Sequence, residues 1–86
     1  MASVAEVKAA IDAAVAQVGD AQLAVRAASE KLTEAQQSLA TALDGSAHES
    51  VDAARAALAQ AGQELEDCLS ATEAAVEQAQ SYGYAL

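Results

Sequence analysis

The sequence predicts an all-α fold in which two long helices form an antiparallel hairpin, and three observations lead to it. Ala, Gln, Glu and Leu, which favour helices, dominate the chain, and no Pro interrupts it. Turn-forming residues cluster at one place, Asp44-Gly45-Ser46, near the middle of the chain. Large apolar residues recur every seven positions in both halves, as they do in coiled coils.

The first helix is expected over residues 4–44. Its start is marked by Ser3-Val4-Ala5-Glu6, a capping box in which the serine hydroxyl accepts from a free backbone N–H and the glutamate reaches back. The turn is expected at about residues 44–47, so the chain forms one domain with no linker.

The second helix is expected over residues 47–82. It opens with the same pattern, Ser46-Ala47-His48-Glu49. Gly83 lies where a glycine commonly ends a helix, so residues 83–86 are predicted to form a short tail.

The heptad pattern predicts which residues meet between the helices. We label Val4 position a, and every seventh residue after it, through Leu39, is large and apolar. Three residues further along, position d holds mostly Ala, from Ala14 to Ala42. In the second half, position a begins at Val51 and position d at Ala54, again with large residues mostly at a and small ones mostly at d. A seam of a and d positions follows.

Folding the chain at Ser46–Ala47 pairs residues whose numbers sum to 93. Nearly every layer then joins one large and one small residue, which favours dense packing. Val25 with Cys68 is an example, and the same sum pairs Ile11 with Tyr82. The same register places Lys31 and Glu64 at nearly one height, where they are expected to form an exposed ion pair.

Composition excludes several classes of protein. The chain has 86 residues, 26 of them Ala, a net charge of −9 and one Cys, so neither an internal disulfide nor nucleic-acid binding by charge is expected. No apolar run is long enough to span a bilayer, and residues 1–8 lack the features of a signal peptide. We therefore expect a cytoplasmic protein without membrane insertion, or one exported without a classical signal peptide.

Apolar residues outside the predicted seam indicate an interaction surface. A two-helix rod has little core of its own, and Val15, Leu43, Leu69 and Val76 occupy position e, with Leu23 near the height of Leu69. The two aromatic residues, Tyr82 and Tyr84, are further candidate anchors. We expect association through this side, either with a second copy to give a four-helix bundle or with a partner helix.

The residues that could carry chemistry are few, and none is expected to be catalytic. His48, the only histidine, is predicted to be a solvated residue beside the turn, where a two-helix rod offers no pocket. Cys68 is predicted to be a small buried residue at position d. The acidic residues of the second half are predicted to form a solvated face or to dock a basic partner. No metal, cofactor or small-molecule ligand is expected.

The hairpin design, the acidic composition and the mid-chain turn Leu43-Asp44-Gly45 resemble the small Trp-X-Gly helical-hairpin proteins of bacterial type VII secretion, and the Ala richness looks actinobacterial. Gly45 matches the family glycine, while Leu43 occupies the tryptophan position and Leu86 the place of an acidic tail residue. His48-x-x-x-Asp52 matches part of a helical pattern of some members. The resemblance implies a non-enzymatic protein that pairs as a four-helix bundle and is exported or accompanies a toxin.

The sequence thus predicts a non-enzymatic module for protein–protein interaction, associated with type VII secretion or with a toxin. The alternative is a cytoplasmic structural coiled coil or small adaptor that assembles with itself.

Overall fold

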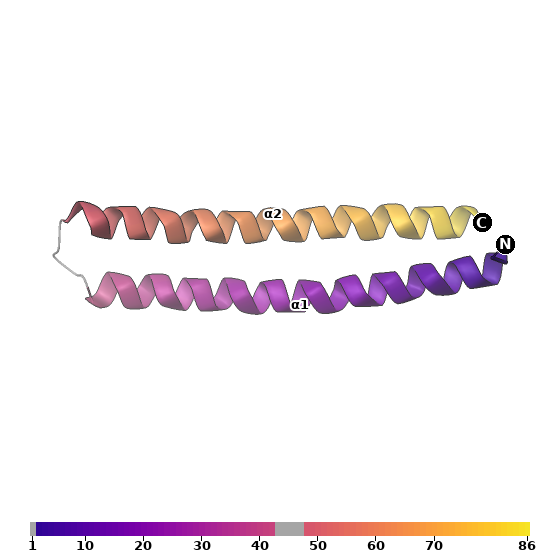
Figure 1. Ribbon diagram of the computed structural model, residues 1–86, viewed down its shortest axis with the longest axis horizontal. Helices are drawn as coiled ribbons and strands as arrows, with labels where there is room; N and C mark the ends of the chain where they lie inside the picture. Colours follow the sequence, from indigo (N-terminus) through magenta and orange to yellow (C-terminus); the bar gives the residue numbers. More distant parts are fainter. Residues whose placement is uncertain (1, 43–47) are drawn as a thin grey trace.

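A computed structural model of the chain describes residues 2–42 and 48–86. Two helices, α1 (Val4–Ala42) and α2 (Glu49–Ala85), lie side by side and run in opposite directions (Figure 1). The start of α1 and the end of α2 therefore lie together at one end of the rod, which we call the open end. The all-α hairpin predicted from the sequence is confirmed. The predicted turn at Asp44-Gly45-Ser46 lies outside the described residues.

Side chains cap the start of both helices. The Ser3 hydroxyl accepts a hydrogen bond of 3.1 Å from the backbone N–H of Glu6, as the first capping box predicts. At α2 the cap is His48, whose ring Nδ1 accepts from the backbone N–H of Ser50 at 3.0 Å. Ser46, the predicted cap of this helix, lies outside the described residues.

The end of α2 differs from the prediction, because the helix continues through Gly83 to Ala85. Glycine ends a helix readily where it adopts a left-handed conformation, but Gly83 keeps the helical one. A side chain at Gly83 would meet Ile11 of α1, with its Cβ 3.6 Å from Ile11 Cδ1. Contact with α1 thus accompanies the last turn of α2, and the predicted tail over residues 83–86 is wrong.

Two contacts between the helices define the register of the hairpin. Gln22 Nε2 donates a hydrogen bond of 3.1 Å to Thr72 Oγ1, and Ile11 faces Gly83. Both pairs of residue numbers sum to 94, so the predicted sum of 93 is one residue off. The predicted layers Ile11–Tyr82 and Val25–Cys68 are accordingly wrong.

The seam between the helices follows positions a and e, where the sequence predicted a and d. Half-buried residues on α1 recur with alternating steps of four and three: Ile11, Val15, Val18, Gln22, Val25, Ser29, Leu32, Gln36 and Leu39. On α2 the corresponding residues are Leu58, Gly62, Leu65, Leu69, Thr72, Val76, Ala79 and Gly83. The d-position alanines predicted to face the seam, such as Ala28 and Ala75, are exposed.

A physical reason for the shift is the size of the residues at position e. Turning each helix toward e brings Val15, Leu69 and Val76 into the seam in place of alanines. Burying a larger apolar side chain removes more apolar area from water than burying a methyl group does. The gain from burying these apolar side chains is partly offset, because the polar residues Gln22 and Ser29 also enter the seam.

The hairpin is a thin rod that measures 64 × 17 × 16 Å. Its radius of gyration is 19.4 Å, whereas a compact domain of this length has about 12 Å. None of the described residues is fully buried. The two helices therefore shield each other only in part, and most of each helix faces outward.

Candidate interaction surfaces

Six of the seven predicted interaction residues lie in the part of the chain that the structure describes, and they fall into two groups. Val15, Leu69 and Val76 lie half-buried in the seam between the helices. They were predicted to form an exposed patch beside the seam, but here they help to hold the hairpin together. These side chains therefore expose less area to a second chain than a patch outside the seam would.

The other predicted interaction residues are exposed where the structure describes them. The exposed fraction is 64% for Leu23, 58% for Tyr82 and 85% for Tyr84. Leu43 lies outside the described residues. The two tyrosines lie near the open end, where Tyr84 also lines a depression of about 230 Å³ with Lys8, Ile11, Asp12, Gln80 and Gly83.

One flank of the seam is formed by position b of both helices. Asp12 and Gln80, both at b, line the depression at the open end. Thr33, Ala59 and Glu66, also at b, line a second depression of about 280 Å³ further along the rod. Since the b positions adjoin, the d positions of both helices share the opposite flank of the seam.

We call the d and g positions within α1 and α2 the alanine face. They comprise 22 residues, of which only Lys31 and Glu64 are charged. Only Val7 and Ala61 among them are half-buried, and the rest are exposed. The face contains thirteen alanines: Ala10, Ala14, Ala21, Ala24, Ala28, Ala35, Ala42, Ala54, Ala57, Ala61, Ala71, Ala75 and Ala85. Its remaining members are Val7, Gln17, Ser38, Ser50, Cys68, Gln78 and Tyr82.

We call the b and f positions of the two helices the acidic face. This face also has 22 residues, but eight of them are charged: Asp12, Arg26, Glu30, Glu49, Asp52, Glu66, Glu73 and Glu77. Seven acids and one arginine give it a net charge of −6. The two broad sides of the rod thus differ sharply in charge, one nearly uncharged and the other strongly negative.

The seam itself holds polar groups. Thr72 accepts from Gln22 and donates its own hydroxyl proton to the carbonyl oxygen of Leu69 at 2.8 Å. The Ser29 hydroxyl is shielded from solvent and has no hydrogen-bond partner within the described residues. A part-buried polar pair between two helices favours one register, because sliding the helices would separate the pair. The Gln22–Thr72 hydrogen bond therefore favours the register in which paired residue numbers sum to 94 over the neighbouring registers.

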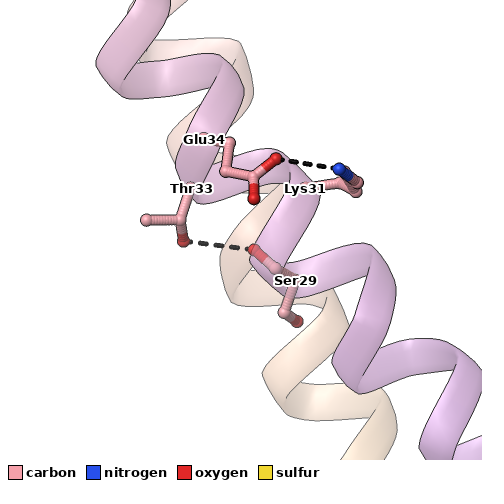
Figure 2. Close-up of polar contacts among 4 residues, drawn as sticks. All are labelled: Ser29, Lys31, Thr33 and Glu34. Atoms are coloured by element: carbon pink, nitrogen blue, oxygen red, sulfur yellow. Dashed lines mark hydrogen bonds and ion pairs between the residues drawn. The ribbon is translucent and has the colours of Figure 1, made fainter.

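The expected ion pair between Lys31 and Glu64 is wrong. Lys31 Nζ instead forms an ion pair of 3.0 Å with Glu34, three residues along the same helix (Figure 2). Glu64 accepts a hydrogen bond of 3.4 Å from Gln60 on its own helix. Next to Lys31, Thr33 donates to the carbonyl oxygen of Ser29 (Figure 2). Neighbours within one helix are close without any ordering of the second helix, which favours the local pair.

The two residues considered for chemistry are both exposed. His48 caps α2 and is thus more than the solvated residue that the sequence predicted. Cys68, predicted to be buried against Val25, lies exposed on the alanine face. The shift of the seam from d to e accounts for this change.

Neither α1 nor α2 has a stretch long and apolar enough to cross a membrane. In residues 2–42 and 48–86, no three His, Cys, Asp or Glu side chains gather in a way that would hold a metal ion.

Comparison with known proteins gives no match. No family model matches the chain, and neither a curated protein nor a solved structure matches it.

The alanine face is the feature that sequence reasoning missed, although the signal was present. Apolar residues at position e on both helices indicate that a and e form the seam. Once e is placed inside, the d alanines must lie outside. Sorting charges by heptad position would then have separated the acidic face from the alanine face.

Proposed function

We propose that this protein is a non-enzymatic helical-hairpin module for protein–protein interaction. The observation that carries the proposal is the lack of any fully buried side chain among the described residues. A single-domain protein normally gains its stability by removing apolar side chains from water. In this hairpin every described apolar side chain stays partly exposed to water, so binding another helical surface would add stability.

The nearly uncharged alanine face supports the same function. Soluble rods usually keep their outward sides charged, as the acidic face does. A side 64 Å long with two charges and thirteen alanines is suited to contact with another protein.

Cross-linking followed by reconstitution tests this function. A photo-reactive amino acid placed at Ala28, on the alanine face, should capture a protein in living cells, whereas the same group at the adjacent Ala27, at position c, should capture little. The captured protein is then identified, purified and mixed with the native chain, and the mass of the complex is measured by sedimentation. Failure of the chain to form any defined complex, with itself or with a captured protein, would contradict the proposed function.

The resemblance to type VII secretion proteins extends the proposal to export. The residues that carry most of it, Leu43-Asp44-Gly45, lie outside the described residues, while the two-helix hairpin supports it at the level of architecture. Export is tested by comparing culture filtrates of cells with and without the secretion ATPase. Equal amounts of the protein in both filtrates would contradict it and favour the alternative, a self-assembling coiled coil or adaptor inside the cell.

A further inference from the structure

The surface area of the hairpin indicates how much of it a partner should cover. The chain exposes 6161 Å², whereas a compact protein of 8.6 kDa exposes about 4,700 Å². The excess is about 1,500 Å² per chain. If two copies each buried that area, their interface would cover about 3,000 Å², which lies in the range of obligate homodimers.

The alanine face has the dimensions that such an interface requires. The rod is 64 Å long and about 17 Å wide, so one broad side has a flat footprint of about 1,100 Å², and its accessible area is larger because side chains corrugate it. The face is continuous along both helices, from Val7 and Tyr82 at the open end to Ala42 and Ala54 near the turn.

Charge selects which side can meet a second copy. Two acidic faces brought together would oppose −6 with −6, and like charges repel strongly where water is excluded. Two alanine faces would bring together one lysine and one glutamate from each chain, a net charge of zero. A basic partner would instead be drawn to the acidic face, so the alanine face is the one suited to self-association.

We propose that the alanine face binds the alanine face of a second copy, with the two rods related by a two-fold axis along their length, to give a four-helix bundle. This inference rests on the proposed function and names the partner and the surface.

The two charges on the face determine the orientation. With residues paired at a sum of 94, Lys31 and Glu64 lie within one residue of the same height, on different helices. A two-fold axis along the rod places α1 of one copy over α2 of the other at unchanged height. Lys31 of each copy then faces Glu64 of the other, giving two ion pairs. An axis across the rod would place α2 over α2 and leave these charges unpaired.

Side-chain volume is consistent with the same orientation. Alanines allow two helix axes to approach closely, as closely packed helical interfaces require. The one aromatic residue of the face, Tyr82, lies at the height of residue 12 and therefore falls between Ala10 and Ala14 of the second copy. A large side chain thus meets two small ones.

The first test introduces charge into the face. Ala28→Glu with Ala75→Glu changes two exposed d positions, and the control, Ala27→Glu with Ala74→Glu, makes the same chemical change one residue earlier on each helix, at position c. Sedimentation equilibrium should give a dimer for the native chain and the control and a chain of 8.6 kDa for the d-position variant. A monomeric native chain, or equal dimerisation of both variants, overturns the proposal.

The second test examines orientation by reversing charges. Lys31→Glu and Glu64→Lys should each weaken dimerisation roughly tenfold, because each turns two attractive pairs into repulsive ones. The double variant, Lys31→Glu with Glu64→Lys, should recover the native dissociation constant. If the double variant stays as weak as the single ones, the orientation is wrong.

The third test does not depend on variants that disturb packing. Cys68 lies at the height of residue 26, so Ala28 of the second copy should lie beside it. After mild oxidation with a copper catalyst and oxygen, Ala28→Cys should form a disulfide-linked dimer that runs as such in non-reducing electrophoresis, whereas Ala27→Cys should not. Absence of the linked dimer for Ala28→Cys overturns the proposal.

These outcomes separate the inference from the proposed function. Suppose that the pure native chain is monomeric, that a captured protein binds it, and that the variant with Ala28→Glu and Ala75→Glu no longer binds that protein. The proposed self-association would then be wrong, and the proposed interaction module would stand.

Discussion

Gly19 and Gly62 lie inside α1 and α2 at places where an added methyl group would meet nothing within 4 Å. Neither glycine is therefore required for a close approach between the two helices. Glycine inside a helix costs about 1 kcal/mol relative to alanine, because the unfolded chain gains freedom. These two positions lower the stability of the hairpin without a visible packing benefit.

Replacing Gly62 by Ala should raise the free energy of unfolding by about 1 kcal/mol. Gly19→Ala should give a similar gain, and since both positions lie off the alanine face, neither change should alter self-association. Thermal unfolding followed by circular dichroism measures the effect. A lower melting temperature for Gly62→Ala would mean that the helices approach more closely there than the structure indicates.

The cap at His48 is a second effect of a single residue. His48→Ala should lower the stability of the hairpin by about 1 kcal/mol, because the N–H of Ser50 loses its acceptor. His48→Asp should keep most of the native stability, since an aspartate oxygen at the same place can accept. The melting temperatures of the two variants, measured by circular dichroism, provide the comparison. Equal melting temperatures would argue against a capping role for His48.

Residue-level prediction from sequence succeeded where the contact is local and of a common type. The Ser3 cap follows from a four-residue pattern and was predictable. The His48 cap was not, because imidazole is not among the usual capping groups. Lys31 was assigned to Glu64 across the hairpin, but Glu34 is closer along its own helix and needs no tertiary contact.

At the scale of the helices, the period of seven and the single turn were enough to predict two long antiparallel helices. They also predicted one of the two heptad positions that form the seam. Position a, from Ile11 to Leu39, faces the seam as predicted. The prediction of d as the second position in the seam was wrong, because the choice between d and e depends on which of the two buries more apolar area. Position d holds mostly small alanines, and position e holds both apolar and polar residues, such as Val15 and Gln22. The packing energies of the two possible seams therefore differ little.

The seam register leads to a test with a matched control. Leu32→Asp and Leu65→Asp should each unfold the hairpin, because each places a charge among half-buried apolar side chains. Leu23→Asp makes the same change at a leucine that is 64% exposed and should leave the helices intact. Circular dichroism at low protein concentration provides the comparison. If Leu23→Asp unfolded the chain as well, that leucine would have to lie in an interface.

At the scale of the whole molecule, the sequence predicted association through a patch of apolar residues beside the seam, but three residues of that patch lie within the seam. Val15, Leu69 and Val76 were read as an outer patch and turned out to complete the hairpin. The face that we propose for association is made of small residues, which the hydrophobicity of single positions does not reveal. It becomes visible only when both helices are assembled and the charges on each side of the rod are compared.

The proposed assembly of two copies would make the stability of the fold depend on protein concentration. Since no side chain in residues 2–42 and 48–86 is fully buried, the proposed dimer would supply much of the stability, and unfolding of the native chain should be coupled to dissociation. With about 0.7 kcal/mol of unfolding enthalpy per residue over two chains of 86 residues, the melting temperature should rise by about 4 °C for each tenfold increase in concentration. Such a shift is easily measured by circular dichroism in cells of different path length.

The variant with Ala28→Glu and Ala75→Glu provides the control for this experiment. Because its alanine face carries two added charges, the variant should melt lower than the native chain and at a temperature independent of concentration. Ala27→Glu with Ala74→Glu should keep the native concentration dependence. A native melting temperature that stays constant across concentrations would mean that the two helices alone supply the stability, and the exposed alanines would then need another explanation.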